Sequence, residues 1–288
     1  MKTGLIIEGG ALRSAFSFGV LKTWADAGVT FPYTAAVSLG NVAAVYFRAR
    51  QSEALEAAYG DYFDAQGEIG RLGMLKGERV INGPAFLDTV MNAHPVDMAA
   101  FLTAEGRLEM AATRSDNGDG MFWPLQEVSK EKHLHQFLRA GVTFPGMGEA
   151  VQLIERSYYD GSIAEPLPVS RALAAGCDRL VVIQTHLRTY SMKRPRLTFG
   201  IASALTDVPM TRNAYLLSHL HYNRELAKMH ALEREGRALI VAPVVESSDL
   251  HRYGVSMSAA SEFYAEGLRL GDAAIESLQR FLEGSAHE

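Results

Sequence analysis

The sequence predicts an α/β fold, a three-layer α/β/α domain with a mainly parallel central sheet. Three observations carry this prediction. Residues 4–40 alternate as strand, turn, helix, strand and turn, and a βαβ unit of this length crosses over right-handed and leaves its strands parallel. Leu180–Gln184 (LVVIQ) is mostly apolar, as strands buried on both faces of a parallel sheet are. Apolar runs and helical patterns then alternate through the rest of the chain.

Length and composition favour one globular domain. The chain has 288 residues, of which 48% are hydrophobic and 21% charged, which excludes a disordered protein. No linker-like stretch divides it, so we expect a single domain over residues 1–288, with a core at about 4–190 and a C-terminal helical extension at about 191–288 packed on it. The net charge of −5 argues against nucleic-acid binding.

The single cysteine, Cys177, cannot form an intramolecular disulfide and fits a reducing compartment. The N-terminal MKTGLIIEGG has one lysine and only a short apolar run, which is not the pattern of a secretory signal. No apolar stretch approaches the roughly 18 residues of a membrane span. We therefore expect a cytoplasmic protein whose membrane contact is peripheral, on the inner face; the oligomeric state stays open.

The N-terminal unit brings a glycine turn and a serine to one edge of the sheet. The apolar run Leu5–Ile7 leads into Gly9-Gly10, and a helical pattern follows over Ala11–Ala27. A second run, Tyr33–Val37, leads into Ser38. Both turns follow parallel strands, so they lie at the C-terminal edge, where open α/β sheets keep their sites. If the two strands are neighbours, the turns lie about 4.8 Å apart sideways.

This pair of turns suits a serine ester hydrolase, which needs an activated hydroxyl and N–H donors aimed at the developing oxyanion. Ser38 lies in Ala36-Val37-Ser38-Leu39-Gly40, a variant of the G-x-S-x-G nucleophile elbow in which alanine replaces the first glycine. Gly9 and Gly10 allow a sharp turn into a helix N-terminus with unpaired N–H groups.

A dinucleotide-binding fold is the alternative, because a glycine turn after the first strand also cradles a pyrophosphate. The G-x-G-x-x-G fingerprint falls here on Gly9, Ala11 and Ser14. The ribose-binding acid expected at the end of the second strand is replaced by Ser38. Both mismatches favour the hydrolase.

Arg13 interrupts the first turn of the helix at residues 11–27. A solvated cation is one interpretation. A cation at a helix N-terminus is electrostatically unfavourable, however. We therefore favour a role for Arg13 near the glycine turn or the substrate.

The other elements follow from periodicity. We expect helices at about 41–62, 83–92, 131–140, 168–175, 201–235 and 258–282, and strands at 108–114, 151–159, 180–184 and 238–241. Residues 63–83 are mixed, which fits either a cover over the site or a connecting loop. SDNGDG at residues 115–120 resembles a calcium loop in composition but lacks the twelfth-position glutamate, so we expect a turn.

The serine needs a proton acceptor. The candidates include nine histidines, most of them in helical patterns that suit packing or surface roles: His94, His133, His135, His186, His219, His221, His230, His251 and His287. His251, in a late loop, is held in reserve. Asp160 is the better partner, because it ends a predicted strand and is followed by Gly161, which permits a tight turn. A plain β-turn aspartate is the alternative. As a base, Asp160 must be desolvated, since an exposed aspartate titrates near 3.9.

Together these residues resemble the bacterial patatin-like phospholipases. The motifs of that family are an oxyanion turn (D/E-G-G-G-x-R/K-G), a G-x-S-x-G elbow soon after it, and a late D-G-G/A. They stand here as EGGALRS at residues 8–14, AVSLG at 36–40 and DGS at 160–162, in the same order. The similarity runs to about Thr189, and the tail, including residues 221–243, looks like the extension of one bacterial subgroup.

The resemblance implies a Ser-Asp dyad that hydrolyses lipid or carboxylic esters. Ser38 would be the nucleophile and Asp160 the base that activates it, without a histidine. The oxyanion hole would be the amides of Gly9, Gly10 and Ala11, with Arg13 nearby for substrate or anion binding. The resemblance implies no metal and no cofactor, and no cluster with zinc-ligand spacing occurs in the sequence.

Four residues depart from the family motifs, namely Ala11, Ser14, Ala36 and Ser162. Each substitute is small, so we expect the geometry of the turns to survive. The alternative is a catalytically weakened lipid-binding protein on the same scaffold.

A basic segment follows the predicted strand at residues 180–184. No acid occurs between Arg179 and Thr206, and the segment carries Arg188, Lys193, Arg194 and Arg196. It emerges at the sheet edge that carries Ser38. A solvated loop is one interpretation; contact with anionic lipid head groups is the other, each cation contributing on the order of 1 kcal/mol.

Overall fold

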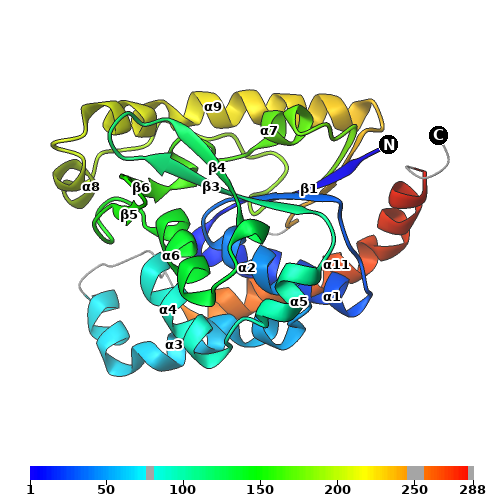
Figure 1. Ribbon diagram of the computed structural model, residues 1–288, viewed down its shortest axis with the longest axis horizontal. Coiled ribbons are helices and arrows are strands. Elements are labelled where there is room, and N and C mark those ends of the chain that lie inside the picture. The colour runs from blue at the N-terminus through cyan, green and yellow to red at the C-terminus, as the bar shows by residue number, and fades with distance from the viewer. Residues whose placement is uncertain (76–80, 245–255, 285–288) are drawn as a thin grey trace.

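The computed structural model describes residues 1–75, 81–244 and 256–284, and it confirms the predicted α/β fold with a mainly parallel central sheet (Figure 1). In the described residues, eight strands lie in the order β5-β6-β3-β2-β1-β7-β8, and β4 pairs with β3. The strands are β1 (Thr3–Ile7), β2 (Tyr33–Ala36), β3 (Arg107–Arg114), β4 (Gly120–Pro124), β5 (Val151–Leu153), β6 (Arg156–Asp160), β7 (Arg179–Ile183) and β8 (Ala238–Val241).

The middle of the sheet is parallel, as expected. β3, β2, β1, β7 and β8 all run in the same direction. β1 lies at the centre, where Ile7 pairs with Ala36 of β2 on one side and with Ile183 of β7 on the other. The segments that follow these three strands therefore emerge side by side at one edge of the sheet.

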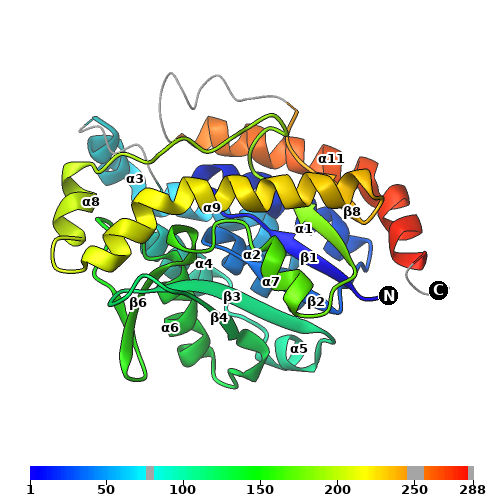
Figure 2. The same cartoon turned by 90° about the horizontal axis from the view of Figure 1, so that it is seen from above.

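Helices cover both faces of the sheet (Figures 1 and 2). One face carries α1 (Ser14–Asp26), α2 (Leu39–Arg48), α3 (Ser52–Leu75), α4 (Gly83–Ala93), α5 (Met98–Thr103), α6 (Glu131–Val142) and α11 (Met257–Glu283). The other face carries α7 (Val169–Ala174) and α9 (Pro209–Arg234), with α8 (Phe199–Ala204) beside the start of α9. Three short 3-10 helices, η1 (Ala11–Arg13), η2 (Leu125–Glu127) and η3 (Gly161–Ile163), complete the described elements.

The alternation of side chains along β1 explains the three layers. Leu5 and Ile7 belong to the core cluster that contains α1, α2 and α11. Ile6, which points to the other face, belongs to the cluster that contains Met229 of α9 and Val169 of α7. All three β1 side chains are fully buried. Because successive side chains of a strand point to opposite faces, an apolar run such as this one needs a helical layer on each side.

α11 comes last in the chain but packs along α1 at the other end of the sequence (Figure 2). Glycines allow this close approach. A Cβ on Gly19 would lie 2.3 Å from the carbonyl oxygen of Tyr264, and one on Gly267 would lie 2.2 Å from that of Phe16. Trp24 Nε1 also donates a hydrogen bond of 3.1 Å to the carbonyl of Gly271. The C-terminal region is thus joined tightly to the N-terminal helix.

Several segments differ from the expected elements. Residues 63–75 continue helix α3 instead of forming a loop, and residues 76–80 lie outside the described part of the chain. The strand expected at 151–159 is a hairpin of β5 and β6, which turns at Ile154 (φ +55°). Residues 120–124 form β4, which was not expected, and the pattern at 201–235 divides into α8 and α9. In the described residues, no helix has the length and hydropathy of a membrane span.

Candidate active site

Ser38 occupies a strained turn between β2 and α2. Its φ of +54° and ψ of −134° lie in a region that non-glycine residues rarely adopt. A nucleophile elbow has this strained strand-to-helix turn, which exposes the hydroxyl above the sheet edge. A Cβ on Gly40 would lie 3.0 Å from Ile7 Cγ2 and 3.1 Å from the Ile7 carbonyl oxygen. The closeness of β1 therefore favours glycine at the second small position of the elbow.

The direction of β6 brings Asp160 to the same place. Met110 of β3 pairs with β2 and also with β4, so β2 and β4 flank opposite edges of β3. Ala112 pairs with β4 on one edge of β3 and with Asp160 on the other. β6 therefore pairs with the same edge of β3 as β2, beyond the point where β2 ends at Ala36. Only two residues of β3, about 7 Å, separate the partner of Ala36 from the partner of Asp160. β6 runs antiparallel to β2, and the two strand ends meet.

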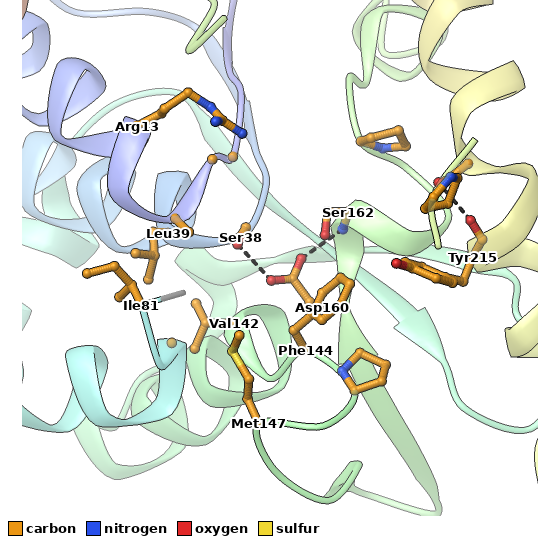
Figure 3. Close-up of a pocket in the computed structure, with 18 of the residues that line it drawn as sticks. Arg13, Ser38, Leu39, Ile81, Val142, Phe144, Met147, Asp160, Ser162 and Tyr215 are labelled. Atoms are coloured by element: carbon orange, nitrogen blue, oxygen red, sulfur yellow. Dashed lines mark hydrogen bonds between the residues drawn. The ribbon is translucent and has the colours of Figure 1, made fainter. Parts of the chain in front are cut away.

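The Asp160 carboxylate lies directly beside the Ser38 hydroxyl (Figure 3). Ser38 Oγ donates a hydrogen bond of 2.7 Å to Asp160 Oδ2, and the Ser162 amide donates one of 2.8 Å to Oδ1. Asp160 is 2% exposed. Burial raises the pKa of its carboxyl to about 6, against the opposing effect of the hydrogen bonds from Ser162 and Ser38.

The backbone around Asp160 is held by its neighbours. Its amide donates to the Thr143 carbonyl at 2.9 Å, and its carbonyl accepts from Thr113 Oγ1 of β3 at 2.9 Å. A Cβ on Gly161 would lie 2.5 Å from the carbonyl carbon and oxygen of Ala111. Glycine is therefore needed after Asp160, because η3 begins against the backbone of β3.

The turn after β1 lies beside the elbow, as the βαβ prediction expected. A Cβ on Gly9 would lie 2.7 Å from Ser38 Cβ, and one on Gly10 would lie 2.6 Å from Thr185 Oγ1. Ala11 has φ +49°, so an alanine adopts a left-handed backbone conformation at the position where the motif of the oxyanion turn has glycine. Within the described residues, the amides of Gly9, Gly10 and Ala11 donate no hydrogen bond to the protein. These amides are available to an oxyanion beside Ser38.

A buried acid supports the turn, and sequence reasoning missed it. Glu8 is 2% exposed and its carboxylate accepts hydrogen bonds from three residues. The donors are the Thr185 amide and hydroxyl, Tyr222 OH at 2.7 Å and His186 Nδ1 at 3.1 Å. His186 and the hydrogen bonds from Tyr222 and Thr185 outweigh desolvation and hold the pKa of Glu8 below its usual range.

This network ties the glycine turn to β7 and α9. The single proton of the Thr185 hydroxyl is shared between Glu8 and the Gly9 carbonyl, which lies 2.7 Å from Oγ1. Tyr222 comes from α9, more than two hundred residues further along the chain than Glu8. The signal available in the sequence was Glu8 itself, because an acid between a buried strand and a glycine turn requires partners. Nothing local identified Tyr222.

Arg13 lies at the start of α1 and lines the cavity above the site. Its Nε is buried without a hydrogen-bond partner. In the described part of the chain, Arg13 forms no ion pair. A guanidinium so placed has unused hydrogen-bonding capacity toward a ligand.

A cavity of about 710 Å³ opens above Ser38 and Asp160. One wall is apolar and comes from the N-terminal two thirds of the chain: Leu39, Ile81, Val142, Phe144 and Met147 (Figure 3). The facing wall comes from the segment after β7, from α8 and from α9, and includes His186, Tyr190, Met192, Ile201, Tyr215, Ser218 and Tyr222. The cavity therefore has room and apolar surface for a hydrocarbon chain next to the serine.

His186 lines the cavity, but no described histidine is bonded to the Ser38 hydroxyl or the Asp160 carboxylate. His94 pairs with Asp61 and His135 with Asp88. His251, which was held in reserve, lies outside the described residues. In the part of the chain that the structure describes, no group of three or more His, Cys, Asp and Glu side chains could hold a metal ion.

Comparison with known proteins gives two family matches, and similar solved structures are also found. Residues 5–173 match the family model of the patatin-like phospholipases. Residues 208–283 match the model of a domain of unknown function (DUF6363). The crystal structure of VipD from Legionella pneumophila is similar, with a TM-score of 0.41 and 11% sequence identity, over 94% of this chain and 67% of that chain.

Proposed function

The chain belongs to the patatin-like phospholipase family, and we propose that it is a serine acyl hydrolase that cleaves lipid or carboxylic esters. The family supports hydrolysis of lipid esters in general. For the catalytic residues, we propose Ser38 as the nucleophile and Asp160 as the base. The observation that carries it is the hydrogen bond of 2.7 Å from Ser38 Oγ to Asp160 Oδ2.

The chemistry follows two balanced steps. Ser38 Oγ attacks the ester carbonyl while its proton passes to Asp160 Oδ2. The tetrahedral intermediate collapses, and the alcohol leaves with the proton from Asp160, which produces acyl-Ser38. A water molecule then attacks the acyl group and gives a proton to Asp160. Collapse of the second intermediate releases the acid and returns that proton to Ser38.

The oxyanion of each intermediate would be bound by the amides of Gly9, Gly10 and Ala11. Support for this assignment is their position beside Ser38 and their lack of a hydrogen-bond partner within the described residues. Donors already in place at a developing oxyanion cost no reorganisation during the reaction. Removing one such donor typically slows an acyl hydrolase by about 10²–10³-fold.

Burial suits Asp160 to this work. An ordinary aspartate is a weak base because its pKa is near 3.9. Burial raises the pKa of Asp160 to about 6. The carboxylate is then still ionised at neutral pH, but its affinity for the serine proton is greater.

Arg13 is proposed to bind an anionic part of the substrate. Its place in the cavity wall and its unpartnered Nε support this role. A lipid with an acyl chain along Leu39 and Met147 would present its charged end toward the guanidinium. Guanidinium groups bind phosphate and carboxylate groups with paired hydrogen bonds.

A second candidate function is lipid binding without catalysis. The observation that favours it is Ala11, which holds a left-handed backbone conformation without glycine in the proposed oxyanion turn. A dinucleotide-binding function has less support, since Ser38 stands where the ribose-binding acid is needed. We also propose a cytoplasmic location, expected from the lone cysteine, and a peripheral contact with an anionic membrane.

Covalent labelling distinguishes hydrolysis from lipid binding. A fluorophosphonate probe phosphonylates a serine only when that serine is activated. We expect the wild-type protein to be labelled and to hydrolyse 4-nitrophenyl butyrate, and Ser38→Ala to do neither while keeping its circular dichroism spectrum. Ser162→Ala, which removes a neighbouring hydroxyl in the same cavity, is the matched control and should still be labelled. Labelling that survives in Ser38→Ala would refute the assignment.

A further inference from the structure

We propose that the protein docks on an anionic bilayer through Lys193, Arg194, Arg196 and Phe199, which we call the docking rim. The inference deepens the proposed function and rests on it, because it takes the substrate to be a lipid drawn from a membrane. The rim lies in the segment between β7 and α8, and at the start of α8.

The rim borders the mouth of the cavity above Ser38. Its neighbours in the same segment line the cavity: Met192, Pro195, Thr198, Gly200 and Ile201. The rim residues do not line the cavity and are exposed. One stretch of chain therefore forms the cavity wall with some of its residues and an outer surface with the others.

Phe199 gives this surface an apolar centre. Its side chain is 91% exposed, the highest value among the large hydrophobic residues that the structure describes. Leu197 and Ile201, on either side, pack against the small cluster around Leu205 and Tyr215, and Phe199 does not. An aromatic ring left in water beside a lipid-binding cavity is suited to the interface of a bilayer, where such rings gather.

The charges on the rim complement anionic head groups. In the described part of the chain, Lys193, Arg194 and Arg196 form no ion pair, although the whole chain carries a net charge of −5. Arg188, the fourth cation expected to contribute, pairs with Glu233 of α9 and reaches the Ile240 carbonyl, so it is not part of the rim. The positive patch is thus local and lies at the cavity mouth.

Hydrogen bonds to α9 hold the rim in place. Asn223 makes two bonds of 2.9 Å to the backbone of Met192, one to its amide and one to its carbonyl. Tyr215 OH donates to the Arg196 carbonyl at 3.1 Å. Because an extended chain advances at most about 3.5 Å per residue, the charges and the ring lie within about 21 Å of one another. That is a footprint of a few lipid head groups, centred on the entrance to the site.

The first experiment measures sedimentation of the full-length protein with vesicles of phosphatidylcholine and phosphatidylglycerol (1:1), or of phosphatidylcholine alone. We expect preference for the anionic vesicles, and loss of binding between 0.1 and 1 M salt, as the Debye length falls from about 10 to about 3 Å. Lys193→Gln/Arg194→Gln/Arg196→Gln should bind the anionic vesicles about a hundred-fold more weakly, at about five-fold for each cation. Phe199→Ser should bind about ten-fold more weakly.

Matched controls separate the rim from general charge and hydrophobicity. Lys130→Gln/Lys132→Gln/Arg234→Gln removes the same charge from other exposed positions. Leu220→Ser removes an apolar side chain that is 59% exposed on α9. Both controls should bind like wild type. In addition, Phe199→Trp should shift its fluorescence to shorter wavelength when anionic vesicles are added, since the new indole would enter the interface.

The outcomes also separate this proposal from the proposed function. Rim variants that lose vesicle binding but still hydrolyse soluble 4-nitrophenyl butyrate would support docking. Wild-type protein that binds vesicles through the rim without any esterase activity would overturn the hydrolase proposal alone. The docking proposal is overturned if wild type does not bind anionic vesicles, or if the rim variants bind them as well as wild type at low salt.

Discussion

Ser38 and Asp160 show how strain and burial combine at a single pair of side chains. The elbow holds Ser38 at φ +54°, a conformation that costs on the order of 1–3 kcal/mol. Asp160 is buried, which disfavours its charged form. Both features destabilise the folded protein locally and both favour the proposed reaction, since one exposes the hydroxyl and the other strengthens the base.

The dyad assignment predicts that Asp160→Asn lowers kcat/KM by several orders of magnitude, because an amide cannot accept the serine proton. His251→Ala, the control for a histidine base, should leave kcat/KM within about two-fold. Steady-state hydrolysis of 4-nitrophenyl butyrate measures both. A larger loss in His251→Ala than in Asp160→Asn would show that the site is a triad.

The raised pKa of Asp160 predicts a pH dependence of activity. The base must be ionised, so kcat/KM should fall about ten-fold for each pH unit below about pH 6 and reach a plateau above it. A profile without an inflection between pH 5 and pH 7 would contradict this role.

The same shift predicts a pH dependence of stability. The pKa of Asp160 is raised on folding from 3.8 to about 6, so its contribution to stability is fully present below about pH 3.8 and is lost as the pH rises through about 6. Asp160→Asn removes the buried charge. Its gain in free energy of unfolding over wild type should be about 1 kcal/mol larger at pH 8 than at pH 5. Urea unfolding at the two pH values tests this, and an equal difference at both would contradict it.

At the scale of elements, the position of the glycine turn depends on β1, β7 and α9 together. Glu8 accepts from Thr185 after β7 and from Tyr222 on α9, and Thr185 also holds the Gly9 carbonyl. A turn held from three elements keeps its amides aimed in one direction, which is what an oxyanion site requires.

This support predicts that Tyr222→Phe lowers kcat about ten-fold with little change in KM, because the turn would lose one of its anchors. A positioning role moves kcat, whereas a merely structural role would move only the melting temperature. Tyr264→Phe on α11, which removes a hydroxyl that is buried without a partner, is the control and should keep wild-type kcat. Equal kcat in Tyr222→Phe and wild type would exclude the role.

At the scale of the whole molecule, we propose that residues 1–288 form one domain. The region that matches the domain of unknown function provides β8 to the sheet, α9 to one face and α11 to the other. It also provides Tyr215, Ser218 and Tyr222 to the cavity. Residues from both matched regions therefore form the same hydrophobic core and line the same cavity.

A shortened chain ending at residue 207 tests this. It would expose the apolar surface of α1 around Phe16 and the face of β7 that α9 covers, so we expect no cooperative thermal transition and no probe labelling. Circular dichroism against temperature measures the first. A cooperative transition together with labelling would show that residues 208–283 are a separate unit.

The N-terminal half of the site could be predicted from the sequence because it depends on short-range geometry. A βαβ crossover makes the turn after one strand and the turn after the next emerge at the same sheet edge. Only η1, α1 and β2 separate Gly9 from Ser38 in the sequence, and the two residues are adjacent in the structure. Asp160 was identified by a motif and a strand end.

The remaining features were decided by tertiary structure alone. The end of β6 meets the end of β2 because both pair with the same edge of β3, and strand pairing over this separation leaves no local pattern in the sequence. Because α9 packs across the sheet, Tyr222 donates a hydrogen bond to Glu8, and Arg188 forms an ion pair with Glu233. The periodicity of a helix or strand can be recognised from neighbouring residues. The partner of a buried charge, in contrast, depends on which distant elements pack together.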